Sequence, residues 1–338
     1  MSLKMKNLTL ITSMVMLFLL LWGASYFAEP AKGTSGFAEN PDVSPDDEEL
    51  VFSYYDDGDA ALYTASLDDG MATLLADPEE GESYIRPSFS PDGEKVAFIK
   101  QWEEEEKPYG ELMIVDRTTD GKVVELTNGD NLVTEAVFSS DGKDIYFTMA
   151  GVYKNYSPIA SERPHDFDIY RMNVQTKEIE QITHRKAYDI SGLAAVPNGE
   201  QIMYQSNDSI VFYSPDDGIR STLVPTGESA PKEPILSSPA LSSDGKRVVF
   251  SGVANKDAHG TFVYEGFQMD VDTGRAEQVT SFHEHVADAM YFNHRNALLV
   301  TIDKKFAQSN DPEYSYWLVD LDNEKRKRLG ITLPDDQE

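Results

Sequence analysis

Aromatic and acidic side chains that could bind a ligand gather in two stretches of this sequence. Trp102 and Tyr109 enclose four consecutive glutamates, which suits a cation or a basic peptide, although a solvated charge run explains the same residues. Tyr153 and Tyr156 follow in the next predicted loop. They either stack on a sugar or a peptide, or pack the loop onto its own sheet. These four aromatic residues are therefore candidates for binding a ligand or a partner.

Histidine side chains form a second group of candidates, and they fall in segments that the chain pattern places between strands. The group comprises His165, His184, His283 and His285, with Asp189 five residues after the second of them. In an extended segment, residues two apart point to the same side, so His283 and His285 are predicted to lie together. The group could line a channel mouth and hold a divalent metal ion. Polar links around a water-filled pore explain the same pattern.

No motif of a known catalytic centre is found in the sequence. It contains no Gly-x-Ser-x-Gly elbow, phosphate-binding glycine loop, zinc-peptidase helix or regular EF-hand loop. With 59 acidic residues, a carboxylate pair for glycoside hydrolysis can be found almost anywhere, so the sequence neither indicates nor excludes one. The absence of cysteine removes disulfides and thiolate chemistry. We predict no catalytic residue, no metal and no cofactor.

The charge balance narrows the range of partners. The formal net charge is −30, and phosphate groups are neutralised by clustered Lys and Arg, so nucleic acid and anionic membrane surfaces are poor partners. An acidic surface of this kind is typical of a protein that stays soluble at high salt or high pH. Because 40% of the residues are hydrophobic, the chain has enough apolar material for a core. We predict a monomer.

A ten-residue string recurs along the chain and indicates the architecture. It reads FSPDGEKVAF at 89–98, FSSDGKDIYF at 138–147, AVPNGEQIMY at 195–204 and LSSDGKRVVF at 241–250. The matching glycines are 49, 57 and 46 residues apart. VSPDDEELVF at 43–52 precedes these copies, and a worn copy, FNHRNALLV, follows at 292–300. A period near fifty residues is typical of a radial or solenoidal array.

Each copy predicts one blade of a propeller. The Ser-Pro-Asp-Gly turn joins two antiparallel strands, a third strand follows a variable loop, and a fourth follows a second turn. Six such units predict an all-β, six-bladed β-propeller of four-stranded antiparallel blades. The long segments 101–110, 151–166, 252–263 and 303–315 are predicted to be loops on one face. That long-loop face and its channel mouth are the predicted binding surface.

The first part of the chain is set apart from the repeats. Lys4 and Lys6 precede an apolar run from residue 8 to 22, and acidic residues begin at Glu29. We interpret residues 1–28 as a signal peptide or an N-terminal membrane anchor, 29–42 as a tether and 43–334 as the propeller. The charge pattern predicts an exported body, either secreted or anchored on the outer side of the cytoplasmic membrane.

The repeats carry a family resemblance. The string RPSFSPDG at 86–93, together with DIYRMN at 168–173 and EQIT at 180–183, resembles the WD40-like (PD40) repeat of TolB-type propellers. The resemblance implies the propeller fold over about residues 36–334. It implies little about function, because similar repeats occur in TolB, in propellers fused to serine peptidases and in carbohydrate-processing proteins. Where TolB proteins carry an α/β domain before the propeller, this chain has only the tether.

Two functions follow as hypotheses. We favour a non-enzymatic extracytoplasmic propeller that binds an envelope protein, a secreted protein or a small ligand through its long-loop face and channel mouth. The alternative is an exported carbohydrate-active lyase or glycosidase with a metal site built from the histidines.

Overall fold

The computed structural model describes residues 33–105, 107–119, 121–154, 163–197, 199, 201–256, 260–308 and 311–334. The predicted signal or anchor segment, residues 29–32 of the tether, and Tyr156 lie outside this part of the chain. Within the described ranges the chain forms β-strands and no α-helix, and so no helix there has the length and apolarity to span a bilayer. The all-β prediction is confirmed for these residues.

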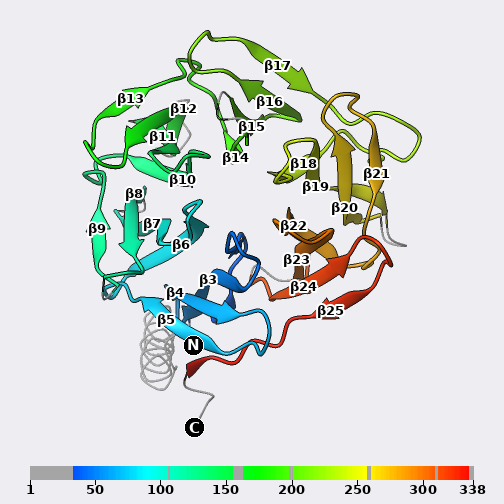
Figure 1. Ribbon diagram of the computed structural model, residues 1–338, viewed down its shortest axis with the longest axis horizontal. Helices are drawn as coiled ribbons and strands as arrows, with labels where there is room; N and C mark the ends of the chain where they lie inside the picture. The colour runs from blue at the N-terminus through cyan, green and yellow to red at the C-terminus, as the bar shows by residue number, and fades with distance from the viewer. Residues whose placement is uncertain are drawn as a thin grey trace, which may run out of the picture. The chain divides into compact units, whose positions relative to one another are not determined.

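The strands run in sequence order from the centre of a ring to its rim, and each sheet is an antiparallel meander (Figure 1). In the first, β1 (Gly36–Phe37) and β2 (Asp42–Val43) both pair with β3 (Glu49–Asp56), which is followed by β4 (Asp59–Ser66) and β5 (Ala72–Ala76). The next two meanders are β6 (Glu82–Phe89), β7 (Lys95–Glu104), β8 (Lys107–Asp116) and β9 (Val123–Glu125), then β10 (Leu132–Phe138), β11 (Asp144–Lys154), β12 (Arg163–Asn173) and β13 (Ile179–Gln181). A parallel contact between Leu132 and Gly110 joins these two into one eight-stranded sheet.

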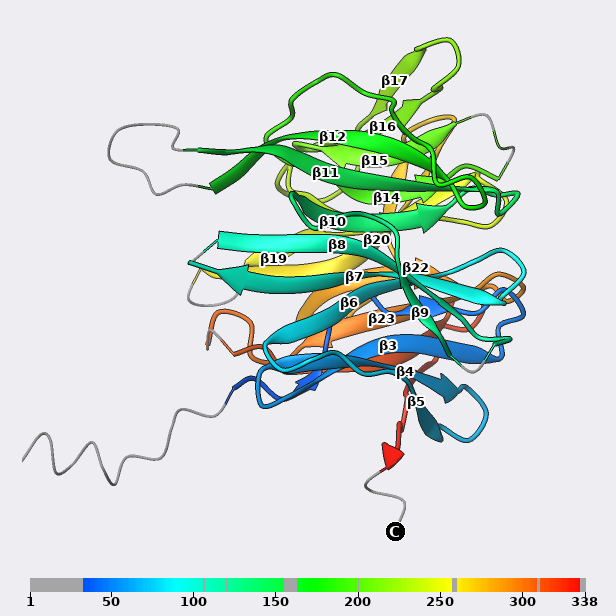
Figure 2. The same ribbon diagram turned by 90° about the vertical axis from the view of Figure 1, so that its left-hand side faces the viewer.

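Three separate four-stranded sheets complete the ring. They are β14 (Ser191–Ala195), β15 (Ile202–Ser206), β16 (Ser209–Tyr213) and β17 (Arg220–Leu223); β18 (Leu236–Leu241), β19 (Arg247–Lys256), β20 (Phe262–Asp270) and β21 (Ala276–Gln278); and β22 (His285–Tyr291), β23 (Ala297–Asp303), β24 (Tyr314–Asp320) and β25 (Arg326–Arg328). Figure 1 shows β6, β10, β14, β18 and β22 nearest the centre, and Figure 2 shows the sheets from the side. This arrangement is that of a β-propeller.

The Ser-Pro-Asp-Gly turns have a hydrogen-bonding reason for their sequence. Ser90 Oγ donates to Asp92 Oδ1 (2.6 Å) and accepts from the Lys95 N–H (2.9 Å), which fixes the hairpin after β6. Gly93 takes a φ of 70°, a conformation in which glycine is favoured. The proline has a second role, since Pro91 lies where a Cβ at Gly142 of the next blade would be 3.5 Å away. The turns of neighbouring blades therefore pack against each other.

The hydrophobic core is divided among the seams between neighbouring sheets. Each buried cluster draws from two adjacent meanders; one contains Leu112, Ile114, Phe138 and Phe147, from the second and third. Fully burying one such side chain contributes roughly 1.5–3 kcal/mol. A single blade could not cover both of its faces, so the ring is stable only when the seams are filled.

The ring closes where the first and last meanders meet. Phe37 lies 5.1 Å from Tyr316 between ring centroids, and the Tyr316 O–H donates to the Ala38 carbonyl (2.6 Å). The buried carboxylate of Asp47 accepts the N–H groups of Asn293 (2.7 Å) and His294 (2.8 Å). The degenerate turn after β22 is thus held by the first blade.

Two predicted boundaries differ from the structure. Residues 36, 37 and 42 fall in the predicted tether, but they pair with β3 and so belong to the first sheet. The described residues of the predicted loops at 101–110 and 151–166 are mostly strand, since β7 and β8 pair as far as Glu104 and Lys107, and β11 and β12 as far as Lys154 and Arg163. The long-loop face is therefore built of protruding hairpins.

Candidate functional site

Three of the four candidate aromatic residues meet on these hairpins. Trp102 is paired with Tyr109 across β7 and β8, and their rings stack with centroids 5.6 Å apart. Tyr153 on β11 stacks on Tyr109 at 5.2 Å, and its O–H donates to the Pro108 carbonyl (2.6 Å). Each ring covers a face of its neighbour, so the stack first serves to join the two hairpins. Its role in binding stays a prediction.

The charges beside this stack are also paired. Lys100 Nζ lies 2.8 Å from Glu111 and 3.2 Å from Glu125, and it sits 5.4 Å from the Trp102 ring. Burial opposes the charged form of Lys100, but its hydrogen bonds with Glu111 and Glu125 outweigh burial and raise its pKa. These partners of Lys100 lie outside the acidic run at 103–106, so a cation or basic-peptide site at that run stays a prediction.

The candidate histidines occupy separate environments. His165 is buried on β12 with Nδ1 2.8 Å from Asp166 Oδ1, whereas His184 and Asp189 are exposed on the link after β13. His283 is exposed with a φ of 58°, and its Nε2 lies 3.3 Å from Ser281 Oγ. That left-handed conformation interrupts the extended alternation on which the pairing of His283 with His285 was predicted.

His285 is enclosed by aromatic rings. It stacks on Phe306 at 3.6 Å between centroids and meets the edge of Tyr264 at 4.8 Å. Burial lowers its pKa to about 4, although the negative charge of Asp303 opposes the shift. Within the part of the chain that the structure describes, no group of three or more His, Asp or Glu side chains is placed to hold a metal ion. The metal site that was one alternative for these histidines is not assembled among the described residues.

The structure places a cavity elsewhere, in the channel at the centre of the ring. The cavity has a volume of about 600 Å³ and is lined by the innermost strands and by the turns that follow them, including Pro45, Pro91 and Pro197. It therefore reaches the turn end of the channel, and none of the predicted site residues within the described ranges lines it. The expected channel mouth among the long loops is not where this cavity lies.

One position of the repeat supplies several of the polar side chains of the channel wall. In each blade, one backbone N–H after the inner strand donates to a carbonyl of the second strand, for example Ser90 to Lys95, and the position stands four residues before that donor. Residues at this position are Asn40, Arg86, Glu135, Gly192, Ser238 and Asp288, and all of them line the cavity. We call them the channel position. The innermost strands shift register here, a β-bulge that re-aims side chains.

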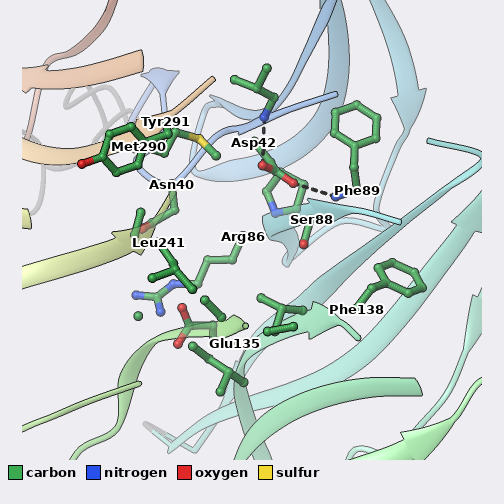
Figure 3. A pocket seen from close by; sticks show the side chains of 18 of the residues that line it. Asn40, Asp42, Arg86, Ser88, Phe89, Glu135, Phe138, Leu241, Met290 and Tyr291 are labelled. Carbon is green, nitrogen blue, oxygen red and sulfur yellow. Dashed lines mark hydrogen bonds between the residues drawn. The ribbon is translucent and has the colours of Figure 1, made fainter. Parts of the chain in front are cut away.

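Two aspartates of the wall have strongly perturbed acidity. Burial raises the pKa of Asp42 to about 7, although the N–H groups of Phe89 (2.7 Å) and Val43 (2.9 Å) donate to its carboxylate (Figure 3). Burial likewise raises the pKa of Asp288 to about 6, against donation from the Asn40 N–H (3.1 Å). Raised carboxyl pKa values of this kind are common in binding and catalytic sites.

Arg86 and Glu135 occupy the middle of the channel. Figure 3 shows both side chains extending into the cavity, with Leu241 and Tyr291 on other parts of the wall. Burial raises the pKa of Glu135 while the charge of Arg86 lowers it, and the Oε2 atom of Glu135 is buried without a hydrogen-bond partner among the described residues. The ion pair of Arg86 with Glu39 is long, at 3.8 Å. The channel thus holds hydrogen-bonding capacity that the described chain leaves unused.

A signal for these residues was present in the repeats. Aligning the copies on the turn glycine puts Arg86, Glu135 and Ser238 in one column of strands that are otherwise rich in small and apolar residues. A polar residue at a fixed place in an inner strand is expected to face the channel. The acidity of the whole chain concealed this column, because carboxylates occur almost everywhere.

Comparisons with known proteins give the fold. No protein-family model matches the sequence, and no curated protein matches it significantly. Among solved structures, TolB from Acinetobacter baumannii is 22% identical with a TM-score of 0.52, and the match covers 71% of this chain and 53% of that one. This chain thus spans about half the length of the TolB structure.

Two further structures resemble the chain over more of its length. An oligogalacturonate lyase in complex with manganese is 14% identical with a TM-score of 0.58, covering 88% of this chain and 78% of that one. A chain of a nidogen–laminin complex is 11% identical with a TM-score of 0.57, covering 82% and 91%. At such identities the likeness establishes the fold alone. The protein has the fold of the TolB-like β-propellers, as the resemblance of its repeats implied.

Proposed function

We propose that this chain is a six-bladed propeller, exported from the cytoplasm, that binds a protein segment or a small ligand in its central channel and catalyses no reaction. The observation that carries the proposal is the cavity at the centre of the ring. It combines partly or fully buried carboxylates of raised pKa with an acceptor atom on Glu135 that has no hydrogen-bond partner in the described part of the chain. Concave sites with a few such polar groups are where ligands bind.

The strand pairings support the blade count, and the first residues of the chain support export. The same turn hydrogen bond starts at Ser44, Ser90, Ser139, Val196, Ser242 and Phe292, once for each meander. The apolar run before residue 28 is preceded by lysines and followed by acidic residues, which suits a signal peptide or an anchor. The likeness to TolB fits a body outside the cytoplasm.

The enzyme alternative has one observation in its favour, the likeness to an oligogalacturonate lyase over most of the chain. The charge of the channel favours binding over that activity. Four lining residues carry carboxyl groups, namely Glu39, Asp42, Glu135 and Asp288, whereas Arg86 is the one Lys or Arg among the lining residues that the structure describes. A polyanionic uronate would be repelled by such a wall. Incubation with oligogalacturonate and Mn²⁺, with ultraviolet detection of unsaturated product, tests the alternative directly.

A channel-filling substitution tests the binding function. The full-length protein in detergent is used to capture partners from an envelope extract, as wild type and as Ser88→Trp. Ser88 lines the cavity, so an indole there fills the space that a ligand needs. The matched control is Ser221→Trp on β17, where the serine is exposed on the rim.

We expect the partners recovered by the wild type and by Ser221→Trp to be lost with Ser88→Trp. A Trp102→Ala, Tyr109→Ala variant, which breaks the hairpin stack, should retain them. Equal recovery by Ser88→Trp, at an unchanged melting temperature, would contradict a channel site. If partners are lost with the hairpin variant alone, the binding site lies on the long hairpins.

A further inference from the structure

We propose that the channel binds a guanidinium or alkylammonium group, and that the Arg86 side chain is a built-in cation that occupies this site until a ligand displaces it. The proposal rests on the channel being the binding site and adds the class of ligand. It follows from the position of Arg86, from the charges around it and from the acceptor that it leaves unused.

Arg86 is directed into the channel by its backbone. It has a φ of 52° and stands at the register shift of β6, immediately before Pro87. Asn40 and Ser238, at the channel position of other blades, have φ values of 56° and 50°. A positive φ in a residue other than glycine is uncommon and is retained where surrounding structure imposes it. The bulge therefore presents this position of the strand, and with it the guanidinium, to the channel.

The surroundings of the guanidinium are those of a cation site. Glu39 is its ion-pair partner at 3.8 Å, and the charge of Arg86 also acts on Glu135 and Asp288, lowering the pKa of each against the larger effect of burial. Charge-assisted hydrogen bonds between such groups are normally 2.7–2.9 Å long. The contact of Arg86 with Glu39 is longer than that, so the tethered cation neutralises the wall without being locked to it.

Glu135 provides the second, independent observation. Backbone N–H groups of Leu193 and Gly192 act on its carboxylate and lower its pKa against the larger effect of burial, whereas its Oε2 atom is buried and has no hydrogen-bond partner within the residues that the structure describes. An unsatisfied buried acceptor is costly, by roughly 1–3 kcal/mol, and a donor that reaches it recovers that energy. A guanidinium or ammonium group supplies N–H donors together with positive charge. An arriving cation can thus complete a bond that Arg86 does not make.

Other ligand classes fit less well. An anion would meet four carboxyl groups and one guanidinium in the cavity wall. A metal ion would need a group of three or more ligating side chains, which the described ranges do not contain. An organic cation requires neither, since one or two carboxylates suffice to bind it.

The test is isothermal titration calorimetry on the full-length protein in detergent. The probe is N-acetyl-arginine amide, and its matched controls are N-acetyl-citrulline amide, which is neutral, and N-acetyl-glutamate amide, which is anionic. Arg86→Met removes the tethered charge and keeps the bulk of the side chain. Arg171→Met is its control, because Arg171 pairs with exposed Glu180 far along the blade from the inner strand.

We expect the arginine probe to bind about tenfold more tightly to Arg86→Met than to the wild type or to Arg171→Met, because the competing charge is gone. Glu135→Gln should weaken binding of the arginine probe about tenfold. Comparison of ethylguanidinium with acetyl-Gly-Arg-Gly amide identifies the source of the group: a peptide source is indicated by tighter binding of the tripeptide, and a free small cation by equal binding.

Three outcomes overturn the proposal: equal binding of the citrulline probe, binding of the glutamate probe that Arg86→Met abolishes, or no binding of the arginine probe to Arg86→Met. The Ser88→Trp variant separates this failure from failure of the proposed function. If envelope partners still require an open channel while the arginine probe does not bind, the ligand class is wrong and the channel function stands. If the probe binds equally to Ser88→Trp, binding lies outside the channel and both proposals fall.

Discussion

The channel wall and the long hairpins use their polar and aromatic side chains in opposite ways. On the hairpins, Trp102, Tyr109 and Tyr153 cover one another, and Lys100 is held by Glu111 and Glu125. In the channel, Asp42 is partly buried and Asp288 is buried, and both have a raised pKa, while the Oε2 atom of Glu135 has no hydrogen-bond partner among the described residues. The hairpin residues satisfy one another, whereas Glu135 in the wall keeps one acceptor atom that the described chain does not use.

This difference shows that conspicuous residues and available residues need not coincide. Aromatic rings spaced along neighbouring strands pack on each other because that removes apolar surface from water. Carboxylates that face the axis of a ring have only other wall residues and water to pair with, and the ring holds these apart. A site is therefore more readily built at the axis than on the hairpins.

The largest effect is expected for Asp42→Ala, which removes an acceptor between two blades. The N–H of Phe89 loses its bond to Asp42 Oδ2, so the free energy of unfolding should fall by about 3 kcal/mol. Asp42→Asn keeps an oxygen acceptor and should cost less than about 1 kcal/mol. Urea unfolding followed by tryptophan fluorescence measures both. Equal losses for the two variants would mean that the hydrogen bond is not what the carboxylate provides.

Trp102→Ala should lower the free energy of unfolding by about 2 kcal/mol, since a half-buried indole and one ring pair are lost. Trp102→Phe, which keeps a stacked ring, should cost about half as much. Neither change should alter binding of the arginine probe, measured by the same calorimetry. Weakened probe binding in both variants would show that the hairpin stack contributes to binding in the channel, against the separation between the two regions.

The pH dependence of stability should have opposite signs for the channel aspartates and for His285. Asp42 and Asp288 have folded pKa values raised above their unfolded values, so they stabilise the fold at low pH and this contribution is lost as pH rises from about 4 to about 7. His285 has a lowered pKa of about 4, so its contribution is present above about 6.5 and is lost as pH falls toward 4.

Replacing the two aspartates, or replacing His285, should reveal the pH dependence of stability that the remaining group causes. With Asp42→Asn and Asp288→Asn combined, the free energy of unfolding should rise between pH 4.5 and 7, whereas with His285→Phe it should fall, each by about 1 kcal/mol after allowance for water in the channel. Urea midpoints across this pH range provide the measurement. Parallel slopes in the two variants would refute the assignment of opposite signs.

The smallest effect is expected for Glu135→Gln. A neutral amide avoids the burial of charge, so the variant should be more stable by about 0.5 kcal/mol at pH 8 while it binds the arginine probe more weakly. Glu125→Gln, which changes an exposed partner of Lys100, should not raise the free energy of unfolding. A loss of more than about 1 kcal/mol in Glu135→Gln would make this glutamate a structural residue.

Much of the fold could be predicted from the sequence because it depends on local chemistry. The recurring Ser-Pro-Asp-Gly turn carries its own hydrogen bonds, seen at Ser90 and Asp92, and the alternation of its flanks requires antiparallel strands. The length of the hairpins could not be predicted in this way. The pairing of Trp102 with Tyr109 continues the ladder through residues whose composition resembles a loop.

The sequence predicted part of the geometry of the candidate residues, and their role in binding stays a prediction. Trp102, Tyr109 and Tyr153 come together as expected for one face, but His184, Asp189, His283 and His285 do not form one group in the described chain. The channel residues were overlooked because each belongs to a different blade. Arg86 and Glu135 are 49 positions apart in the sequence, and nothing local marks them as neighbours.

The strands, the turns and the repeat can be read from the amino-acid sequence, since they depend on backbone conformation and on side chains a few residues apart. Which polar residues face the axis, and how they are paired, depends instead on how the blades pack together. That outcome depends on closing the ring, where Asp47 holds the turn of the last blade and brings Asp288 to the same wall as Asp42. Burial and charge at the axis arise from all the blades together, so no single repeat encodes them.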